Sequence, residues 1–422
     1  MKKHRLKHID LNLYTETLPN GLLVNIVVKK KVNNIYVTFS TKYGSFQNEF
    51  IPIGEKKMFT APLGVAHFLE HKVFEQKNGK DPFEFYTRNG ADTNASTSHL
   101  KTTYLFSGIG HFKENIEYLL DFVQTPHFTK ENVEKEKGII EQEIKMYEDI
   151  PFWKLFDKTL SNSFFEHPLK YPIAGTIQSI NEITKEDLYK CYNTFYHPSN
   201  MFVTIVGDVN PEEVIEIIAS NQASKKYPIQ SKIVLKEYAE KDEVVKAYEE
   251  IIFDVELPKV AVAYKINSNG NDANRLKRYL GSYINIKTGS TSKLFEKLKM
   301  NNLLTGDIET EIVIAGDHLL CVLLFESREY TEVLQEIDQE IKNKAIDEQD
   351  LNRKKKVSKS SCVFRSDSIY SLASKINGNI LNHNKVILDE FKDIDSFNIE
   401  ELKGILNRIS FENKTITVVK SR

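Results

Sequence analysis

Two histidines and a glutamate at helical spacing carry the clearest chemical signal in the chain. They lie in the segment Pro62-Leu-Gly-Val-Ala-His67-Phe-Leu-Glu70-His71. In a helix, His67 and His71 lie one turn apart on the same face, and Glu70 lies on nearly that face. Two neighbouring imidazoles can bind one Zn²⁺, and a carboxylate beside them can accept a proton from water at the metal. The pattern indicates a zinc-dependent hydrolase; the alternative, two histidines on a partly buried helix, is uncommon in a chain with only 11 histidines.

A zinc site with two histidines needs a third protein ligand. The segment 131–148 has apolar residues at helical spacing, which predicts a helix with one buried face. Glu136 and Glu143 lie almost two turns apart and point the same way, so one can bind the metal while the other supports a ligand roughly 10 Å along the axis. Glu134 and Glu141 form a second pair with the same spacing on another face. Spacing alone does not choose between the pairs, and a solvated acidic face is the alternative for either.

An internal repeat predicts how these residues are positioned. Ile180–Leu188 resembles Ile394–Leu402, 214 positions later, and the match continues downstream through Met201–Val206. Each copy has the pattern of a helix followed by a strand, with Thr184 or Asn398 as the helix N-cap. The repeat indicates two duplicated domains.

The length of the chain also predicts two domains, because 422 residues exceed the roughly 250 to 300 that a single core contains. We expect a zinc-binding domain over residues 1–220, a linker over 221–245, and a domain of the same fold without the zinc motif over 246–422. Strand patterns alternate with helix patterns in both halves, which predicts an α+β fold in which each domain packs helices on an antiparallel-rich sheet. The expected strands are Val24–Val28, Ile35–Thr41, Lys101–Ser107, Val260–Lys265 and His318–Phe325; the expected helices are Lys113–Val123, Lys130–Glu148, Pro211–Ala219 and Thr331–Asn343.

Composition excludes several other classes of protein. The formal net charge of −2 argues against a nucleic-acid binder. Cys191, Cys321 and Cys362 are scattered, which favours a reducing, cytoplasmic location. Polar residues interrupt Leu6–Tyr14, so no export signal is expected, and no apolar run approaches the roughly 20 residues of a membrane span.

The sequence around these residues resembles the pitrilysin or insulinase family of zinc metallopeptidases. His67-Phe-Leu-Glu-His71 with a distal glutamate is the inverted zinc motif H-x-x-E-H. Further family patterns are matched by Gly90–Thr97, by Val133–Glu143 and by Phe195–Asp208. The resemblance covers most of residues 20–215 and, more weakly, the second half. It is closest to the short, two-domain bacterial branch that includes processing peptidases.

The resemblance assigns a role to each residue of the predicted site. It implies that His67, His71 and Glu143 bind Zn²⁺, that Glu70 is the general base, and that Glu136 orients a zinc-binding histidine. The spacing of 72 residues between His71 and Glu143 fits the family.

The resemblance also implies a substrate site at Asn94 and Ala95. These residues match an edge strand on which a peptide is bound through its backbone as an added strand. The alternative is an ordinary edge strand without a substrate role.

One part of the family pattern is missing from the second half. After Ser292-Lys-Leu-Phe295, Lys299 stands where the family has Arg, and Gly306 stands where it has Tyr. Because Lys lacks the planar fork of Arg and Gly lacks a hydroxyl, two donors to the substrate carbonyl are weakened or lost. The resemblance therefore predicts one half of a clamshell, active on short unstructured peptides as a heterodimer whose partner lacks H-x-x-E-H and supplies Arg and Tyr. A homodimer and a non-catalytic scaffold subunit are the alternatives.

Overall fold

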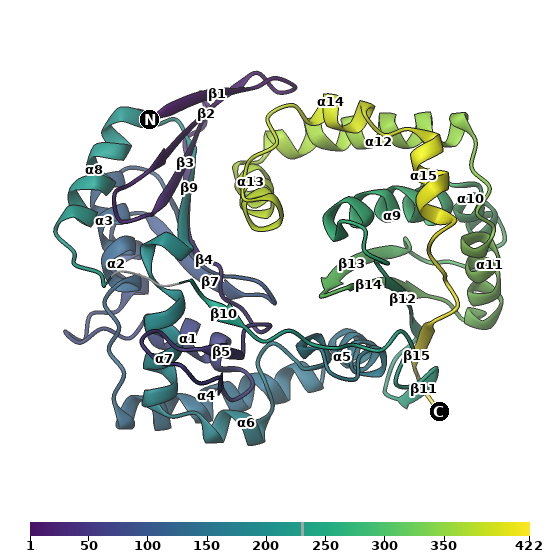
Figure 1. The fold of residues 1–422 in the computed structure, drawn as a ribbon, viewed down its shortest axis with the longest axis horizontal. Coiled ribbons are helices and arrows are strands. Elements are labelled where there is room, and N and C mark those ends of the chain that lie inside the picture. Colours follow the sequence, from purple (N-terminus) through teal and green to yellow (C-terminus); the bar gives the residue numbers. More distant parts are fainter. Residues whose placement is uncertain (229–231) are drawn as a thin grey trace. The chain divides into compact units, whose positions relative to one another are not determined.

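The protein is described here by a computed structural model over residues 1–228 and 232–422. It divides into two compact units, each with its own main sheet (Figure 1). Unit 1 comprises residues 1–144, 172–236 and 361–390, and unit 2 comprises residues 145–171, 237–360 and 391–422. The predicted α+β fold is confirmed.

Unit 1 contains a seven-stranded sheet in the order β1-β2-β3-β9-β4-β8-β7. Neighbouring strands are antiparallel except for β3 and β9, which are parallel. A small second sheet has the order β10-β5-β6. The strands of unit 1 are β1 (Lys2–Leu6), β2 (Leu11–Thr17), β3 (Leu23–Val28), β4 (Ile35–Thr41), β5 (Glu49–Ile51), β6 (Phe59–Thr60), β7 (Ala91–Thr97), β8 (Thr102–Gly108), β9 (Met201–Gly207) and β10 (Val234–Leu235).

Apolar side chains cover both faces of the main sheet of unit 1. Ile26 and Ile205 belong to the larger core, whereas Val27 and Val206 pack with helix α13 on the opposite face. Every residue of β9 is therefore buried, as expected for a central strand covered on both sides. The helices of unit 1 are α1 (Val65–Val73), α2 (Pro82–Arg88), α3 (Phe112–Val123), most of α4 (Lys130–Glu148), α6 (Ile177–Glu182), α7 (Lys185–Phe195), α8 (Pro211–Ala223) and α13 (Ile369–His383).

Unit 2 contains a five-stranded sheet in the order β11-β15-β12-β14-β13. Its strands are β11 (Tyr248–Ile252), β12 (Lys259–Asn267), β13 (Glu309–Ala315), β14 (His318–Glu326) and β15 (Lys414–Lys420). Helix α5 packs on β12 and β15. The helices of unit 2 are α5 (Pro151–Ser163), α9 (Ala273–Thr288), α10 (Lys293–Met300), α11 (Tyr330–Lys342), most of α12 (Glu348–Asp367), α14 (Glu390–Asp395) and α15 (Ile399–Leu406).

The two sheets repeat one pairing scheme. In unit 1 the series β3-β9-β4-β8-β7 has one parallel pair followed by three antiparallel pairs, and β11-β15-β12-β14-β13 in unit 2 has the same succession. The N-caps of the repeated helices also match, because the side chain of Thr184 accepts from the Asp187 amide and that of Asn398 accepts from the Glu401 amide. The predicted duplication is confirmed.

The expected domains were continuous stretches of the chain. Each compact unit is instead built from three separate segments. Residues 145–171 belong to unit 2, although they precede most of the second half of the chain. Residues 361–390 belong to unit 1, because α13 packs on β4 and β9. These assignments depend on contacts between distant segments, which local sequence patterns do not contain.

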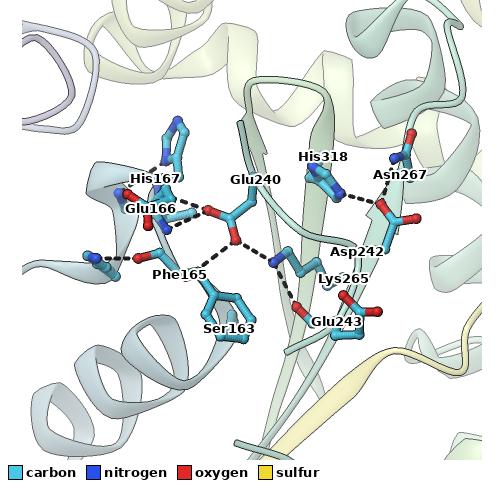
Figure 2. A network of polar contacts seen from close by, with 12 residues as sticks. Ser163, Phe165, Glu166, His167, Glu240, Asp242, Glu243, Lys265, Asn267 and His318 are labelled. Atoms are coloured by element: carbon cyan, nitrogen blue, oxygen red, sulfur yellow. Dashed lines mark hydrogen bonds and ion pairs between the residues drawn. The ribbon is translucent and has the colours of Figure 1, made fainter. Parts of the chain in front are cut away.

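A buried ion pair fixes the segment that leads into unit 2 (Figure 2). Lys265 Nζ lies 2.8 Å from Glu240 Oε1, and the two side chains are 0% and 3% exposed. The same carboxylate accepts hydrogen bonds from the backbone amides of residues 165–167 at 2.8 to 2.9 Å. Burial alone would raise the pKa of Glu240, but these hydrogen bonds lower it to about 2. Part of the expected linker 221–245 is thus tied to the core of unit 2.

Within the described ranges, no helix is both long enough and apolar enough to span a lipid bilayer.

Candidate metal centre

Helix α1 presents the two histidines and Glu70 from the core of unit 1. The helix begins after Gly64, which has φ of +85°, and a Cβ atom there would lie 2.3 Å from the carbonyl oxygen of Ala174. Only glycine meets both constraints without strain. Phe68 and Leu69 are fully buried in the core of unit 1. The helix is thereby fixed in rotation, which determines where its polar side chains point.

Three side chains on two helices converge at the predicted metal site. Glu143 of α4 lies with Oε1 3.5 Å from His67 Nε2 and with Oε2 3.3 Å from His71 Nε2. One ligand atom from each of the three residues lies within 4.8 Å of the other two. Tetrahedral zinc with bonds of about 2.0 to 2.2 Å separates its ligand atoms by roughly 3.4 Å. His67, His71 and Glu143 therefore fit a Zn²⁺ ion.

The donor atoms on the two histidines are also consistent with metal binding. His71 Nδ1 is engaged by Glu136 Oε1 at 3.1 Å, which leaves Nε2 toward Glu143. His67 Nδ1 is buried and has no hydrogen-bond partner among the described residues. Burial would lower the pKa of His71, but its hydrogen bonds to Glu136 and Glu143 raise it to about 9 in the metal-free protein. Because a metal binds neutral imidazole, this proton would be released if a metal bound here.

Helix α4 supplies both predicted carboxylates. Its buried residues Val133, Ile140 and Ile144 pack into the core of unit 1, so Glu136 and Glu143 are presented to α1. Glu134 instead pairs with Lys137 at 2.7 Å, and its side chain is 57% exposed. Of the two pairs that the sequence left open, the structure brings Glu136 and Glu143 to the histidines.

Lys72 is a residue whose role sequence reasoning missed. Its side chain is fully buried and forms ion pairs with Glu75 and, at 3.3 Å, with Glu136 Oε2. Burial would raise the pKa of Glu136, but the hydrogen bond with His71 and the charge of Lys72 together lower it. Glu136 is thus a partly buried carboxylate with a cation on one oxygen and the imidazole on the other. The available signal was a lysine directly after the second histidine, in a short helix with five apolar residues.

Strand β7 passes beside Glu70 and forms one edge of the main sheet. β7 pairs with β8 alone among the described strands, so its other edge is open. Asn94 lies exposed on this strand, and the Ala95 amide donates to the Asn94 side chain at 2.8 Å. At the end of the strand, Thr97 Oγ1 donates to Glu70 Oε2 at 2.5 Å. No local sequence pattern connects Thr97 with Glu70.

The two departures from the expected pattern lie in unit 2. Lys299, on α10, donates from Nζ to the carbonyl oxygen of Thr305 at 2.9 Å. Gly306 has φ outside the left-handed range, and a Cβ atom added there would have no atom within 4 Å. Unit 2 thus has an ammonium group and a residue without a side chain at these two positions.

Family models match both halves of the chain. The model described as "Insulinase (Peptidase family M16)" matches residues 51–177, which contain the metal centre. The model described as "Peptidase M16 inactive domain" matches residues 182–358.

Similar proteins come from bacteria and a plant. A relative in Bacillus subtilis, named an uncharacterized zinc protease, YmfH, is 46% identical over 265 residues, which are 63% of this chain and 62% of the relative. A relative in Arabidopsis thaliana, named as a mitochondrial-processing peptidase subunit beta, is 27% identical over 208 residues, 47% of this chain and 36% of the relative. The crystal structure of an M16-like peptidase from Alicyclobacillus acidocaldarius superposes with a TM-score of 0.91 and 28% identity over 98% of this chain and 99% of that one.

Proposed function

Because the chain belongs to the pitrilysin or insulinase family of M16 peptidases, we propose that it is a zinc-dependent endopeptidase acting on short, unstructured peptides. The observation that carries the proposal is the convergence of His67, His71 and Glu143 at distances that fit zinc, with Glu70 on the same helix.

The chain's own residues supply the proton transfer that peptide hydrolysis requires. When bound by His67, His71 and Glu143, zinc would polarise the peptide carbonyl and acidify a water molecule. Glu70 accepts the proton of the attacking water and delivers it to the leaving amine. Glu136 accepts the Nδ1–H of His71 and so keeps Nε2 available as a ligand.

The open edge of β7 is the proposed substrate site. An extended peptide added there pairs through its backbone, so the residue types of the substrate matter little for binding. Asn94 and Ala95 lie on this edge strand. Only a segment without stable structure of its own can pair in this way, which supports unstructured peptides as the substrate class.

The proposed assembly is a heterodimer with a homologous chain that supplies Arg and Tyr. Lys299 and Gly306 support it, because Lys offers an ammonium group in place of the planar fork of Arg and Gly offers no hydroxyl to a developing oxyanion. The Arabidopsis relative is named as a subunit of a processing peptidase. Three free, buried cysteines support the proposed cytoplasmic setting. A scaffold role is less favoured, because Glu70 is present and the three proposed metal ligands lie together.

The test is cleavage of a quenched-fluorescent, unstructured peptide of about 15 to 20 residues, long enough for an extended site at roughly 3.3 Å per residue. The metal-free chain should not cleave the peptide, and addition of zinc should produce internal cleavage identified by mass spectrometry. If the zinc-bound chain alone does not cleave, addition of a homologous chain with Arg and Tyr should produce cleavage. Absence of cleavage both with and without the homologous chain would contradict the proposal.

A further inference from the structure

We propose that Thr97 is a positioning residue that orients the Glu70 carboxylate and couples it to the substrate-binding strand β7. This inference rests on the proposed peptidase function and deepens it. Its basis is the hydrogen bond of 2.5 Å from Thr97 Oγ1 to Glu70 Oε2, which joins the end of β7 to helix α1.

The direction of this hydrogen bond is determined by the groups involved. A carboxylate only accepts, so the single hydroxyl proton of Thr97 points to Glu70. The Thr97 oxygen also lies 3.3 Å from Thr102 Oγ1, and Thr102 lies 2.9 Å from the carbonyl oxygen of Tyr43. Thr97 and Thr102 are directly opposite each other in the pairing of β7 with β8. The backbone pairing of β7 with β8 therefore determines where the Thr97 hydroxyl lies.

The surroundings of Glu70 make the hydrogen bond from Thr97 important for the orientation of the Glu70 carboxylate. Glu70 is only 8% exposed, so little water is available to replace a lost partner. Burial and, to a smaller extent, the charge of Glu70 raise the pKa of both Tyr104 and Tyr196, which are 0% and 2% exposed and whose hydroxyl oxygens lie 2.9 Å apart. Because Oε2 of Glu70 accepts the hydrogen bond from Thr97, Oε1 of Glu70 is the oxygen that takes the proton of the attacking water.

The same strand provides the coupling to substrate. Thr97 lies two residues after Ala95, a separation of roughly 7 Å along an extended strand. A peptide that adds to the open edge of β7 restrains the backbone of this strand, and Thr97 transmits that restraint to Glu70. The loss of the hydroxyl should therefore lower kcat, whereas peptide binding along β7, and with it KM, should change little.

Three substitutions separate positioning from a structural effect. Thr97→Val removes the hydroxyl at nearly constant volume, and kcat should fall about 10- to 100-fold with KM within about twofold. Thr97→Ser keeps the hydroxyl and should restore kcat to within about threefold of the parent. Thr93→Val is the matched control, because Thr93 lies on the same strand and donates to the Leu105 carbonyl oxygen at 2.8 Å, away from Glu70. If Thr97→Val does not fold, Thr97→Ala removes the same hydroxyl.

A structural readout decides the inference without depending on activity. Crystal structures of the metal-free variants should show the Glu70 carboxylate displaced by more than about 0.5 Å in Thr97→Val and unmoved in Thr97→Ser and Thr93→Val. An unmoved Glu70 in Thr97→Val, a parental kcat in that variant, or a change confined to KM would overturn the role of Thr97. If the parent does not cleave peptide in any assembly, the proposed function fails, and the Glu70 position still decides the inference.

Discussion

Glu136 engages the ring nitrogen of His71 that faces away from the metal site: its Oε1 lies 3.1 Å from His71 Nδ1. The two residues are 65 positions apart in the chain, on α4 and α1. This contact selects the tautomer in which Nε2 is the metal donor. The metal centre is therefore an assembly of two helices.

Glu136→Gln should weaken zinc binding, because the amide is a poorer acceptor for the Nδ1–H of His71. The expected loss is about 10- to 100-fold in affinity. Competition with a chromogenic chelator measures it. Glu134→Gln is the matched control, because Glu134 is an exposed residue of the same helix; an equal loss in both variants would argue against the orienting role of Glu136.

Lys72→Met should lower the free energy of unfolding of the metal-free protein. The substitution leaves Glu136, whose side chain is 12% exposed, without its buried cation. Because His71, whose pKa is raised to about 9, remains beside Glu136 as a second cation, the expected cost is that of one charged hydrogen bond, about 1.5 to 3 kcal/mol. Chemical denaturation measures the effect.

Glu75→Gln is the control for Lys72→Met, because Glu75 is the other ion-pair partner of Lys72 and its side chain is 44% exposed. It should cost under about 1 kcal/mol. If Lys72→Met were as stable as the parent, the buried lysine would have no role in balancing Glu136.

Glu240→Gln tests the ion pair that fixes the entry to unit 2 (Figure 2). At neutral pH it should destabilise the chain by about 3 kcal/mol, because Lys265 stays buried without its partner. The pKa of Glu240 falls from 4.5 to about 2 on folding, so its contribution is present above pH 4.5 and is lost as the pH falls toward 2.

The difference in the free energy of unfolding between the parent and Glu240→Gln should therefore become smaller as the pH falls from 4.5 to about 2. Denaturation curves at several pH values measure it. The double variant Glu240→Gln with Lys265→Met should recover part of the loss. A difference that is independent of pH would contradict the role of this ion pair.

Gly64→Ala should destabilise helix α1 and the metal centre together. The added Cβ would meet the Ala174 carbonyl at 2.3 Å, in a backbone conformation with φ of +85°. Gly54→Ala is the control, because Gly54 also has positive φ, +78°, but a Cβ added there would have no atom within 4 Å. Thermal unfolding should show a larger decrease in Tm for Gly64→Ala than for Gly54→Ala. Equal decreases would mean that backbone strain alone explains the effect, without a contribution from the clash with Ala174.

The sequence predicted the elements of the centre because they depend on local spacing. The predicted helix Lys130–Glu148 has the bounds of α4, and His67 and His71 share a face of α1 as the spacing required. The sequence did not predict that Lys72 is buried, since lysine normally favours solvent and its burial depends on a carboxylate from another helix.

Other features could not be predicted from the sequence, because they too depend on contacts between distant elements. The bond between Thr97 and Glu70 joins a strand and a helix, and neither has a local pattern that reports the other. The packing of α13 on unit 1 is a contact between residues far apart in the chain. Local patterns therefore identified the two histidines and limited the third ligand to two glutamate pairs on one helix, whereas tertiary packing determines which pair faces the histidines and which groups orient them.

The most direct test of the central claim measures zinc content and peptide cleavage on the same preparation of Glu70→Gln, in whichever assembly the parent is active. The variant should retain about one zinc per chain, because Glu70 is not among the three converging donors, while kcat falls by at least about 10²- to 10⁴-fold. Retained zinc with unchanged cleavage would contradict the assignment of Glu70 as the base and, with it, the proposed mechanism.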